Sequence, residues 1–324
     1  MKEALFIKLN REKWIEIEKD LENHSSIPPD QLTKHFIRLT DDLSFAKTYF
    51  PNSKPHVYLN ELASRIHRLI YKNKKENKKR FITFWQYELP EIIFHSRKKL
   101  VYSFLIFSVA ILIGAYSSAH DKNFARLIMG DAYINMTEAN IANDDPMAVY
   151  KDSKQVGMFL GITINNIRVS FVVFAMGIFA SLGTAFFLFQ NGIMLGAFQY
   201  FFYQKGLLMT SALTIWIHGT LEISAIIIAG AAGLVVGNSM LFPGSYSRMD
   251  SFRRGAKNGM KIVIGLVPVF ITAGFLEGFV TRLTEMPDFA KWLIIGSSLA
   301  FIVYYIIIYP EILYGNGKYT RSKN

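Results

Sequence analysis

The stretch TIWIHGTLEISAIIIAGAAGLVVG, residues 214–237, is an apolar run long enough to cross a bilayer as a helix. It also places His218 and Glu222 one helical turn apart within that run. An ionisable side chain at the centre of a bilayer costs about 2.5–3.5 kcal/mol on insertion scales, so such groups are expected to pair or to face a wet cavity. The stretch therefore predicts a membrane-spanning helix with a specialised polar face.

One face of this predicted helix combines the ionisable pair with small side chains. At about 100° per residue, four further positions fall within roughly 60° of His218 on the helical wheel. They are Glu222, Ala225, Ala229 and Gly233. Small residues let the backbone of a neighbouring helix approach closely, so we expect this face to contact protein rather than lipid. Gly192 and Gly219 are likewise expected to serve helix packing.

The composition agrees with a membrane protein that also has a soluble region. Of the 324 residues, 51% are hydrophobic and 19% are charged. The net charge of +11 arises largely beside apolar segments, at 72–80, 97–99 and 248–261. This placement favours orientation in a bilayer and contact with anionic headgroups over nucleic-acid binding. Cysteine is absent, which excludes disulfides, thiolate metal sites and a cysteine nucleophile.

The apolar runs predict an all-α polytopic membrane protein with about six transmembrane or re-entrant helices. The transmembrane domain is expected over residues 96–314. Its predicted spans cover 100–119, 157–189, 192–205, 207–237, 262–281 and 292–310. Gln190–Gly192 indicates a turn, and the arm 192–205 is so short that it either spans obliquely or re-enters from one side.

The charges of the connecting segments predict the orientation of the chain. Segment 120–156 is polar without an excess of Lys and Arg, which indicates an outer loop. Segment 238–261 and the tail 315–324 are basic, which predicts cytoplasmic positions under the positive-inside rule. With six crossings, both termini are expected in the cytoplasm, and the protein is expected in a cytoplasmic (inner) membrane.

Residues 1–95 predict a cytoplasmic helical region. Apolar residues recur at steps of three and four between positions 30 and 50, which indicates an amphipathic helix. Similar patterns before and after it predict two more helices, and the three are expected to pack as a small bundle. The stretch 81–94, FITFWQYELPEIIF, indicates an interfacial amphipathic helix or, alternatively, another bundle helix.

Further polar residues fall inside the predicted spans. Asn165, Asn166 and Arg168 lie near the outer end of the second span, and Glu277 lies in the fifth. If the second span is continuous, Asn191 shares the helix face of Asn166. The polar positions are therefore distributed over at least three spans.

Depth along the helices predicts how the charges pair. Glu277 lies about 6 Å, and His218 about 16 Å, below the expected outer ends of their helices. Arg168 enters from the outer side, so Arg168 with Glu277 is the expected ion pair. His218 and Glu222 are then expected to pair locally.

These polar groups allow three interpretations: they lock helices together, they form a functional core for a proton, an ion or a lipid headgroup, or they bind metal. His218 and Glu222 are spaced as two ligands on one face, but no second histidine accompanies them, so no metal or other cofactor is predicted. The His-Glu-x-x-His pattern of zinc proteases and Gly-rich phosphate loops are absent. No span offers a nucleophile with a base. No catalytic residue is therefore assigned, and a non-enzymatic protein is expected.

Four blocks of the sequence resemble the stage II sporulation protein M family of multi-span bacterial membrane proteins. They are NNIRVSF at 165–171, GIFASLGTAFFLFQNGIMLG at 177–196, HGTLEISAIIIAGAAGL at 218–234 and FLEGF at 275–279. The N-terminal region also looks like the helical N-terminal region of the family. The resemblance marks as signature positions Asn165, Asn166, Asn191, Gly192, His218, Gly219, Glu222 and Glu277.

The resemblance implies a role without hydrolytic chemistry of its own. In spore formers, the similar protein works with a peptidoglycan amidase and a lytic transglycosylase at the engulfing membrane. We therefore expect a non-enzymatic membrane scaffold of a bacterial envelope complex. Its expected partners are membrane lipids, envelope proteins such as peptidoglycan hydrolases, and a second copy of the chain, with no nucleic acid. A permease-like transporter or channel that uses the polar core is the alternative, and an intramembrane metalloenzyme ranks last.

Overall fold

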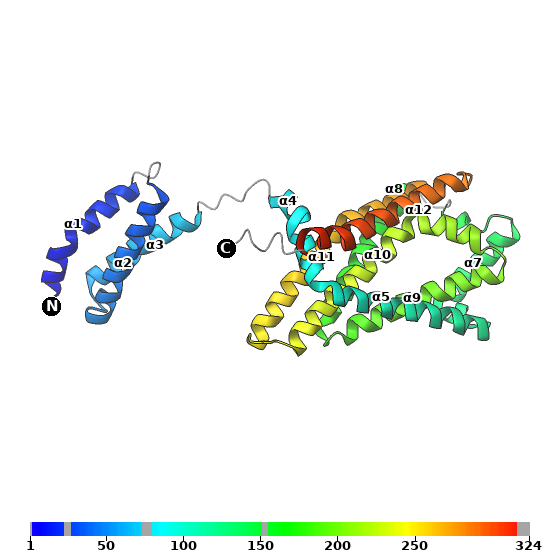
Figure 1. Cartoon of the computed structure of the whole chain (residues 1–324), viewed down its shortest axis with the longest axis horizontal. Coiled ribbons are helices and arrows are strands. Elements are labelled where there is room, and N and C mark those ends of the chain that lie inside the picture. The colour runs from blue at the N-terminus through cyan, green and yellow to red at the C-terminus, as the bar shows by residue number, and fades with distance from the viewer. Residues whose placement is uncertain (1, 23–26, 73–79, 151–154, 316–324) are drawn as a thin grey trace. The chain divides into compact units, whose positions relative to one another are not determined.

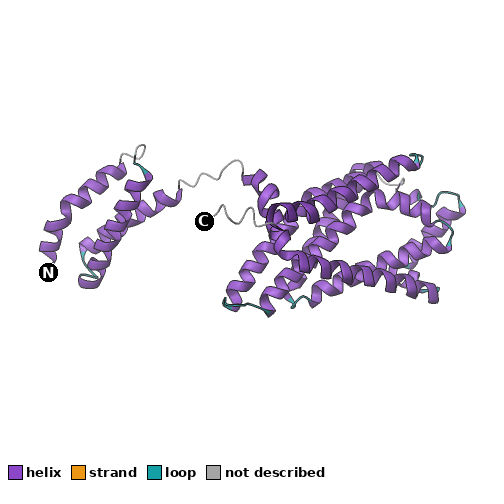
Figure 2. Ribbon diagram, in the orientation of Figure 1, coloured by secondary structure: helices purple, strands orange, loops and turns teal. Residues whose placement is uncertain are grey.

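The computed structural model describes residues 2–22, 27–72, 80–150 and 155–315. All the regular structure in these residues is helical (Figure 2), which confirms the predicted all-α class. The chain divides into two compact units, here called the N-terminal unit (Met1–Phe81) and the membrane unit (Ile82–Asn324). Most of the basic run at 72–80 and of the tail at 315–324 lies outside the described residues.

The described residues of the N-terminal unit up to Lys72 form three helices, α1 (Glu3–Glu22), α2 (Pro29–Tyr49) and α3 (Lys54–Lys72). The Trp14 indole of α1 donates a hydrogen bond of 2.8 Å from Nε1 to Oδ2 of Asp42 in α2. These are the three helices that the sequence predicts, and the hydrogen bond joins the first to the second. Their apolar faces form one core of Phe6, Trp14, Ile17, Leu21, Leu39, Ala46, Leu59, Leu62 and Ile66.

Within the part of the membrane unit that the structure describes, six helices are long and apolar enough to cross a bilayer. The chain is therefore a multi-pass membrane protein. Four spans centre on α5 (Leu89–His120), α8 (Gln155–Ala175), α9 (Leu182–Gln204) and α10 (Leu208–Leu241). The last two centre on α11 (Arg248–Phe275), which continues as a π-helix over Leu276–Val280, and on α12 (Asp288–Ile302), which continues to Gly315.

Helix α10 is the centre of the membrane unit (Figure 1). In its most apolar window 72% of residues are buried within the protein, against 17% in the span of α12. Helices α5, α8, α9, α11 and α12 all pack against it. The stretch that first indicated a spanning helix is therefore surrounded by protein rather than by lipid.

The second span differs from its prediction, because the chain turns at 179–181 and not at Gln190–Gly192. Ala180 and Ser181 have positive φ angles of 49° and 70°, and α9 begins directly after them. Asn191 and Gly192 lie inside α9, so the Asn-Gly pair was wrongly interpreted as a turn. A Cβ on Gly192 would lie 2.6 Å from Ala110 Cβ, so this glycine serves the close approach of α5.

The new position of the turn changes the neighbouring boundaries. The expected span 157–189 becomes the shorter α8, and the expected short arm 192–205 becomes part of α9, which has 23 residues and needs no re-entrant path. Asn166 lies in α8 and Asn191 in α9. The prediction that they share one face of a continuous helix is therefore wrong. The basic segment 248–261 is likewise the start of α11 rather than a loop.

The stretch 81–94 is not a separate helix but the start of the first span, and its residues from Ile82 onward belong to the membrane unit rather than to the bundle. Helical residues 80–88 run directly into α5, so that one helix extends from Arg80 to His120. Tyr305 donates a hydrogen bond of 2.7 Å from its hydroxyl to the Trp85 carbonyl, and Leu89 and Ile93 are buried in the main core. Protein covers the apolar side of this stretch from Phe84 onward, whereas Phe81 and Ile82 are exposed, and periodicity alone could not make this distinction.

The expected outer loop contains helices α6 (Phe124–Met129) and α7 (Asp131–Ala142) and a short 3₁₀ helix, Ala148–Tyr150. Ala125, Ile134 and Met147 from this segment share a core with Phe201 and Phe202 of α9. Figure 1 shows α7 at one end of the membrane unit and the connection between α10 and α11 at the other. The segment is thus a packed cap on one end of the helices.

Candidate functional site

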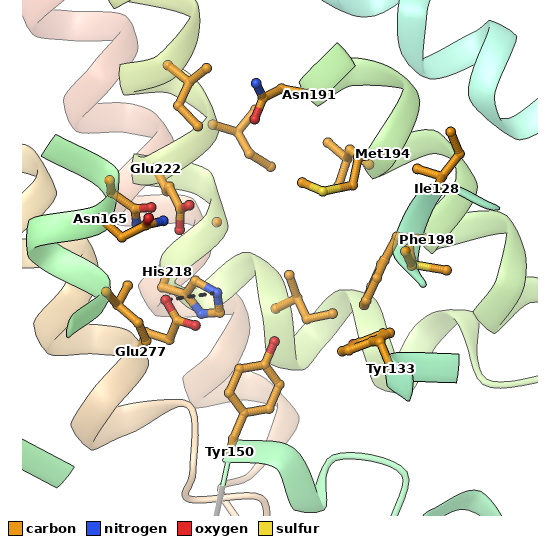
Figure 3. Close-up of a pocket in the computed structure, with 18 of the residues that line it drawn as sticks. Ile128, Tyr133, Tyr150, Asn165, Asn191, Met194, Phe198, His218, Glu222 and Glu277 are labelled. Carbon is orange, nitrogen blue, oxygen red and sulfur yellow. Dashed lines mark ion pairs between the residues drawn. The ribbon is translucent and has the colours of Figure 1, made fainter. Parts of the chain in front are cut away.

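A cavity of about 600 Å³ lies beside the first half of α10 (Figure 3). Side chains from α5, α8, α9, α10, the π-helix after α11 and the cap segment form its wall. Most of the lining is apolar, including Phe107, Met194, Phe198 and Ile215. The polar residues that line it are Tyr133, Tyr150, Asn165, Asn166, Asn191, His218, Glu222 and Glu277.

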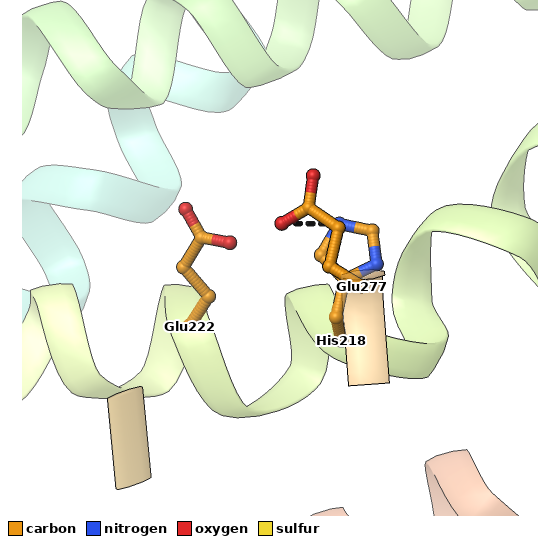
Figure 4. Close-up of side chains that lie close together, drawn as sticks. All are labelled: His218, Glu222 and Glu277. Atoms are coloured by element: carbon orange, nitrogen blue, oxygen red, sulfur yellow. Dashed lines mark ion pairs between the residues drawn. The ribbon is translucent and has the colours of Figure 1, made fainter. Parts of the chain in front are cut away.

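Three ionisable side chains meet in this wall, two from α10 and one from the π-helix (Figure 4). His218 Nε2 lies 3.7 Å from Glu277 Oε2, and these side chains are only 5% and 14% exposed. One donor atom each from His218, Glu222 and Glu277 lies within 4.8 Å of the others. Segments about 55 residues apart in the sequence thus form one buried cluster, here called the His-Glu-Glu cluster.

The other ring nitrogen of His218 is held by Thr281. His218 Nδ1 lies 3.0 Å from Thr281 Oγ1, and this hydroxyl donates its hydrogen to the Leu276 carbonyl at 3.2 Å. A hydroxyl has one hydrogen, so Thr281 accepts a hydrogen bond from Nδ1–H of His218. When the ring is neutral, Nε2 therefore carries the lone pair that faces the carboxylates.

The geometry contradicts the predicted pairing of Arg168 with Glu277. Glu277 pairs with His218, whereas Arg168 is exposed and lines a neighbouring cavity of about 580 Å³. The depth estimate assumed that the helix ends share one plane, but Thr281, just beyond the π-helix, lies beside His218, well inside α10. The expected local pair of His218 and Glu222 is likewise replaced by the three-residue cluster.

The three asparagines surround the cluster in different ways. Asn165 is exposed and lies between the two cavities, lining both. Asn166 is 6% exposed, and its amide interacts with Glu222, but its Nδ2 has no hydrogen-bond partner of normal geometry among the described residues. Asn191 donates from Nδ2 to the Phe187 carbonyl of its own helix at 2.8 Å. Asn166 thus brings a buried amide to the cavity wall beside Glu222.

The small residues of α10 divide into two groups. Ala225 and Ala229 are fully buried, and a Cβ on Gly233 would lie 2.8 Å from the Val173 carbonyl. In contrast, Gly219 lines the cavity, and a Cβ there would meet nothing closer than 3.7 Å. The face is therefore sealed by protein beyond Ala225 and opens onto a cavity at Gly219.

Tyr150 and Thr281 belong to the site but carry no signal in the sequence. The Tyr150 ring centroid lies 5.9 Å from that of His218, and Figure 3 shows its hydroxyl directed into the cavity. Burial, reinforced by the charge of Glu277, raises the pKa of Tyr150 well above its usual range, so the hydroxyl stays a hydrogen-bond donor at neutral pH. Only the fold of the cap segment brings Tyr150 to α10.

The comparisons with known proteins divide the chain at the same place as the structure does. A family model described as stage II sporulation protein M matches residues 103–282, which include every residue of the His-Glu-Glu cluster. A second one, described as Domain of unknown function (DUF8413), matches residues 4–72 in the N-terminal unit. No curated protein and no solved structure matches the chain.

Proposed function

The chain belongs to the stage II sporulation protein M family, and from this premise we propose that it is a non-enzymatic integral membrane scaffold of a bacterial envelope complex. The observation that carries the proposal is the joining of two compact units that match two different family models. A helical bundle linked to a multi-pass membrane unit suits a protein that recruits partners to a membrane. By family resemblance, the proposed partners are peptidoglycan hydrolases and other envelope proteins, together with membrane lipids and a second copy of the chain.

The proposal places the protein in the inner membrane with both termini in the cytoplasm. Charge distribution supports this orientation, because Arg97, Lys98 and Lys99 precede the apolar part of α5, and five basic residues lie in 248–261. Reporter fusions at Gly244, between α10 and α11, and at Gly130, between α6 and α7, test it. Green fluorescent protein is expected to fluoresce only at the first site, and alkaline phosphatase to be active only at the second.

Crosslinking in native membranes tests the scaffold. The full chain is expected to capture a peptidoglycan hydrolase, and the double variant His218→Ala with Glu222→Gln is expected to capture the same protein, because the cluster lies inside the membrane unit. The variant must first elute as folded protein in detergent. Absence of any envelope protein above the level of an unrelated six-span control contradicts the scaffold.

The cavity favours a second candidate function, a permease or channel for a small solute or ion. A scaffold has no need for a cavity of about 600 Å³ with ionisable side chains in its wall, whereas a transporter requires polar groups at membrane depth. In proteoliposomes, this function predicts a solute or ion flux that the same double variant abolishes. Retained crosslinks with lost flux indicate transport, and retained crosslinks without any flux in the native sequence indicate a scaffold alone.

A further inference from the structure

We propose that His218, Glu222 and Glu277 bind one divalent transition-metal ion inside the membrane unit. The proposal goes beyond the scaffold and does not depend on it. A metal site in this position is independent of whether the protein also recruits partners or moves a solute.

The charge of the cluster is the first argument. Two carboxylates line one buried wall, and no Lys or Arg is found among the described residues that line the cavity. Ionised carboxylates are costly in a low-dielectric interior unless a cation or a proton compensates them. A divalent cation neutralises two carboxylates without using the histidine, which then binds as a neutral ligand.

The orientation of His218 is the second argument. Its Nδ1–H is engaged by Thr281 Oγ1 at 3.0 Å, which leaves Nε2 directed at Glu277 Oε2, 3.7 Å away. A lone pair opposite an ionised carboxylate oxygen is repulsive unless a proton or a metal cation lies between them, and a metal cation can be shared by all three side chains. Histidines that bind metal commonly donate their second N–H to a neighbouring oxygen, which fixes the tautomer and the ring orientation.

The distances are the third argument. A metal with ligand bonds of about 2.0–2.2 Å holds two ligand atoms at most about 4.4 Å apart. The 3.7 Å between His218 Nε2 and Glu277 Oε2 is already within this limit, and all three donor atoms lie within 4.8 Å. Small rotations of the Glu222 and Glu277 side chains therefore bring the set to bonding distance.

The surroundings of the cluster are the fourth argument. Three protein ligands beside a cavity leave coordination positions for water or for a ligand in the cavity. The buried Asn166 side chain lines the same wall and has an Nδ2 without a partner of normal geometry among the described residues, so it can donate to a metal-bound oxygen. Glu277 lies on a π-helix, a distortion that occurs frequently at functional sites.

The donor set selects the class of metal. One imidazole and two carboxylates suit Zn²⁺, Mn²⁺ or Fe²⁺, whereas Mg²⁺ and Ca²⁺ prefer oxygen ligands only. The chain has no cysteine, so thiolate ligands do not compete. Zn²⁺ is a suitable probe because it is stable to redox change and is bound by this kind of set.

The test uses the full chain, purified in detergent through a tag without histidines, stripped with chelator and reconstituted with Zn²⁺. Elemental analysis is expected to give one Zn²⁺ per chain. Loss of a group that only supports a metal ligand typically lowers the affinity by roughly 10–100-fold. A larger loss of Zn²⁺ affinity is expected for each ligand variant, His218→Asn, Glu222→Gln and Glu277→Gln. Thr281→Val, which removes such a support, is expected to weaken binding within that 10–100-fold range.

The matched controls change the same residue types outside the cavity. His120 and Glu285 are exposed, and His120→Asn and Glu285→Gln are expected to keep the full Zn²⁺ content. Binding that is equal in the three ligand variants and in the wild-type chain overturns the proposal. Wild-type protein that retains no Zn²⁺ above the level of a triple ligand variant also overturns it.

A second measurement needs no variant and therefore remains valid if a substitution prevents folding. Co²⁺ added to the stripped wild-type chain is expected to give visible absorption bands stronger than those of aqueous Co²⁺, and Zn²⁺ is expected to abolish them. Bands no stronger than those of the free ion overturn the proposal. A cluster that holds a proton instead of a metal gives this negative result.

Discussion

One face of α10 has two halves with opposite surroundings. Beyond Ala225, Val173 of α8 and Thr184 of α9 pack against Gly233. The backbone of the turn between these helices packs against Gly237, where a Cβ would lie 2.8 Å from Ser181 Cα. Around Gly219 the same face opens onto a cavity. Residues of α8 and α9 line this cavity and the neighbouring one, so the two helices do not close over α10 here. The comparison shows that a stripe of small residues does not determine whether a helix face is sealed. The position of the neighbouring turn decides it.

The difference also explains why the ionisable residues are tolerated. Ionisable side chains in the sealed half would lack room and partners, whereas in the open half they line a cavity that also holds other polar side chains and is capped by residues 124–150. The sealed half supplies the packing that holds α8, α9 and α10 in place. We therefore expect the two halves to respond differently to substitution, and four predictions test this.

The largest effect is expected in the sealed half, for Gly233→Val. The added side chain would press against the Val173 carbonyl, 2.8 Å from the Cβ position. Overpacking of a tight core costs about 1–3 kcal/mol and sometimes more, and here backbone is the obstacle, so the upper end is expected. The measurement is the folded fraction and the thermal midpoint of the purified chain in detergent.

The matched control for this substitution is Gly296→Val in α12. A Cβ on Gly296 meets nothing within 4 Å, and the residue is exposed on a helix that also spans. It is expected to fold as the wild-type chain does. Equal losses in both variants mean that any valine is harmful in a spanning helix, and the comparison of the two halves then fails.

Thr281→Val is expected to have the next largest effect, on the wall of the open half. Thr281 is 1% exposed, and its loss leaves the buried Nδ1–H of His218 without its acceptor. An unsatisfied buried donor costs about 1–3 kcal/mol. Thermal unfolding in detergent measures it. The exposed Thr272, which bonds only the Pro268 carbonyl of its own helix, provides the control Thr272→Val, and a loss as large as that in Thr281→Val contradicts the specific role of Thr281.

The sequence predicts the helices and the polar residues of the site, but it does not predict which half of α10 is sealed and which is open. The helical content, the six spanning helices and the apolar core of the N-terminal unit follow from length and periodicity, because burial on one face leaves a periodic trace. The polar residues His218, Glu222 and Glu277 were also found, because ionisable groups are rare in apolar runs. What they pair with could not be derived, since helical rise gives depth only if helix ends share a plane.

The turn between α8 and α9 lies where composition does not indicate one. The Asn-Gly pair at 191–192 has the composition of a turn, but its glycine permits contact with α5, and the real turn at 179–181 uses Ala180 and Ser181 with positive φ. Alanine and serine rarely adopt that conformation, so composition could not indicate it. Thr281 and Tyr150 were missed because their roles depend entirely on tertiary contacts.

Gly219→Ala is expected to have a smaller effect of opposite sign. Glycine in a helix interior is less favourable than alanine by about 1 kcal/mol, and the new methyl group meets no atom closer than 3.7 Å. A stabilisation of up to about 1 kcal/mol is therefore expected, seen as a raised thermal midpoint. Gly192→Ala is the matched comparison and is expected to destabilise, because Ala110 Cβ lies 2.6 Å from its Cβ position. Equal responses mean that Gly219 is as tightly packed as Gly192.

The smallest change in stability is expected at the rim of the open half, where the charged side chains are partly exposed rather than buried. Glu138 of the cap accepts hydrogen bonds of 2.8 Å from Arg126 Nη2 and from Lys205 Nζ at the end of α9. The bond from Lys205 holds the pKa of Glu138 below its usual range. The stabilisation is therefore complete above the unfolded-state pKa and is lost as the pH falls through the lower folded-state pKa. Because the pair is partly exposed, it is expected to stabilise the fold by at most about 1 kcal/mol.

The test compares the thermal midpoints of the wild-type chain and of Glu138→Gln. They should differ at neutral pH and converge in acid or at high salt. A difference that is independent of both pH and salt means that packing, not charge, holds the cap on α9.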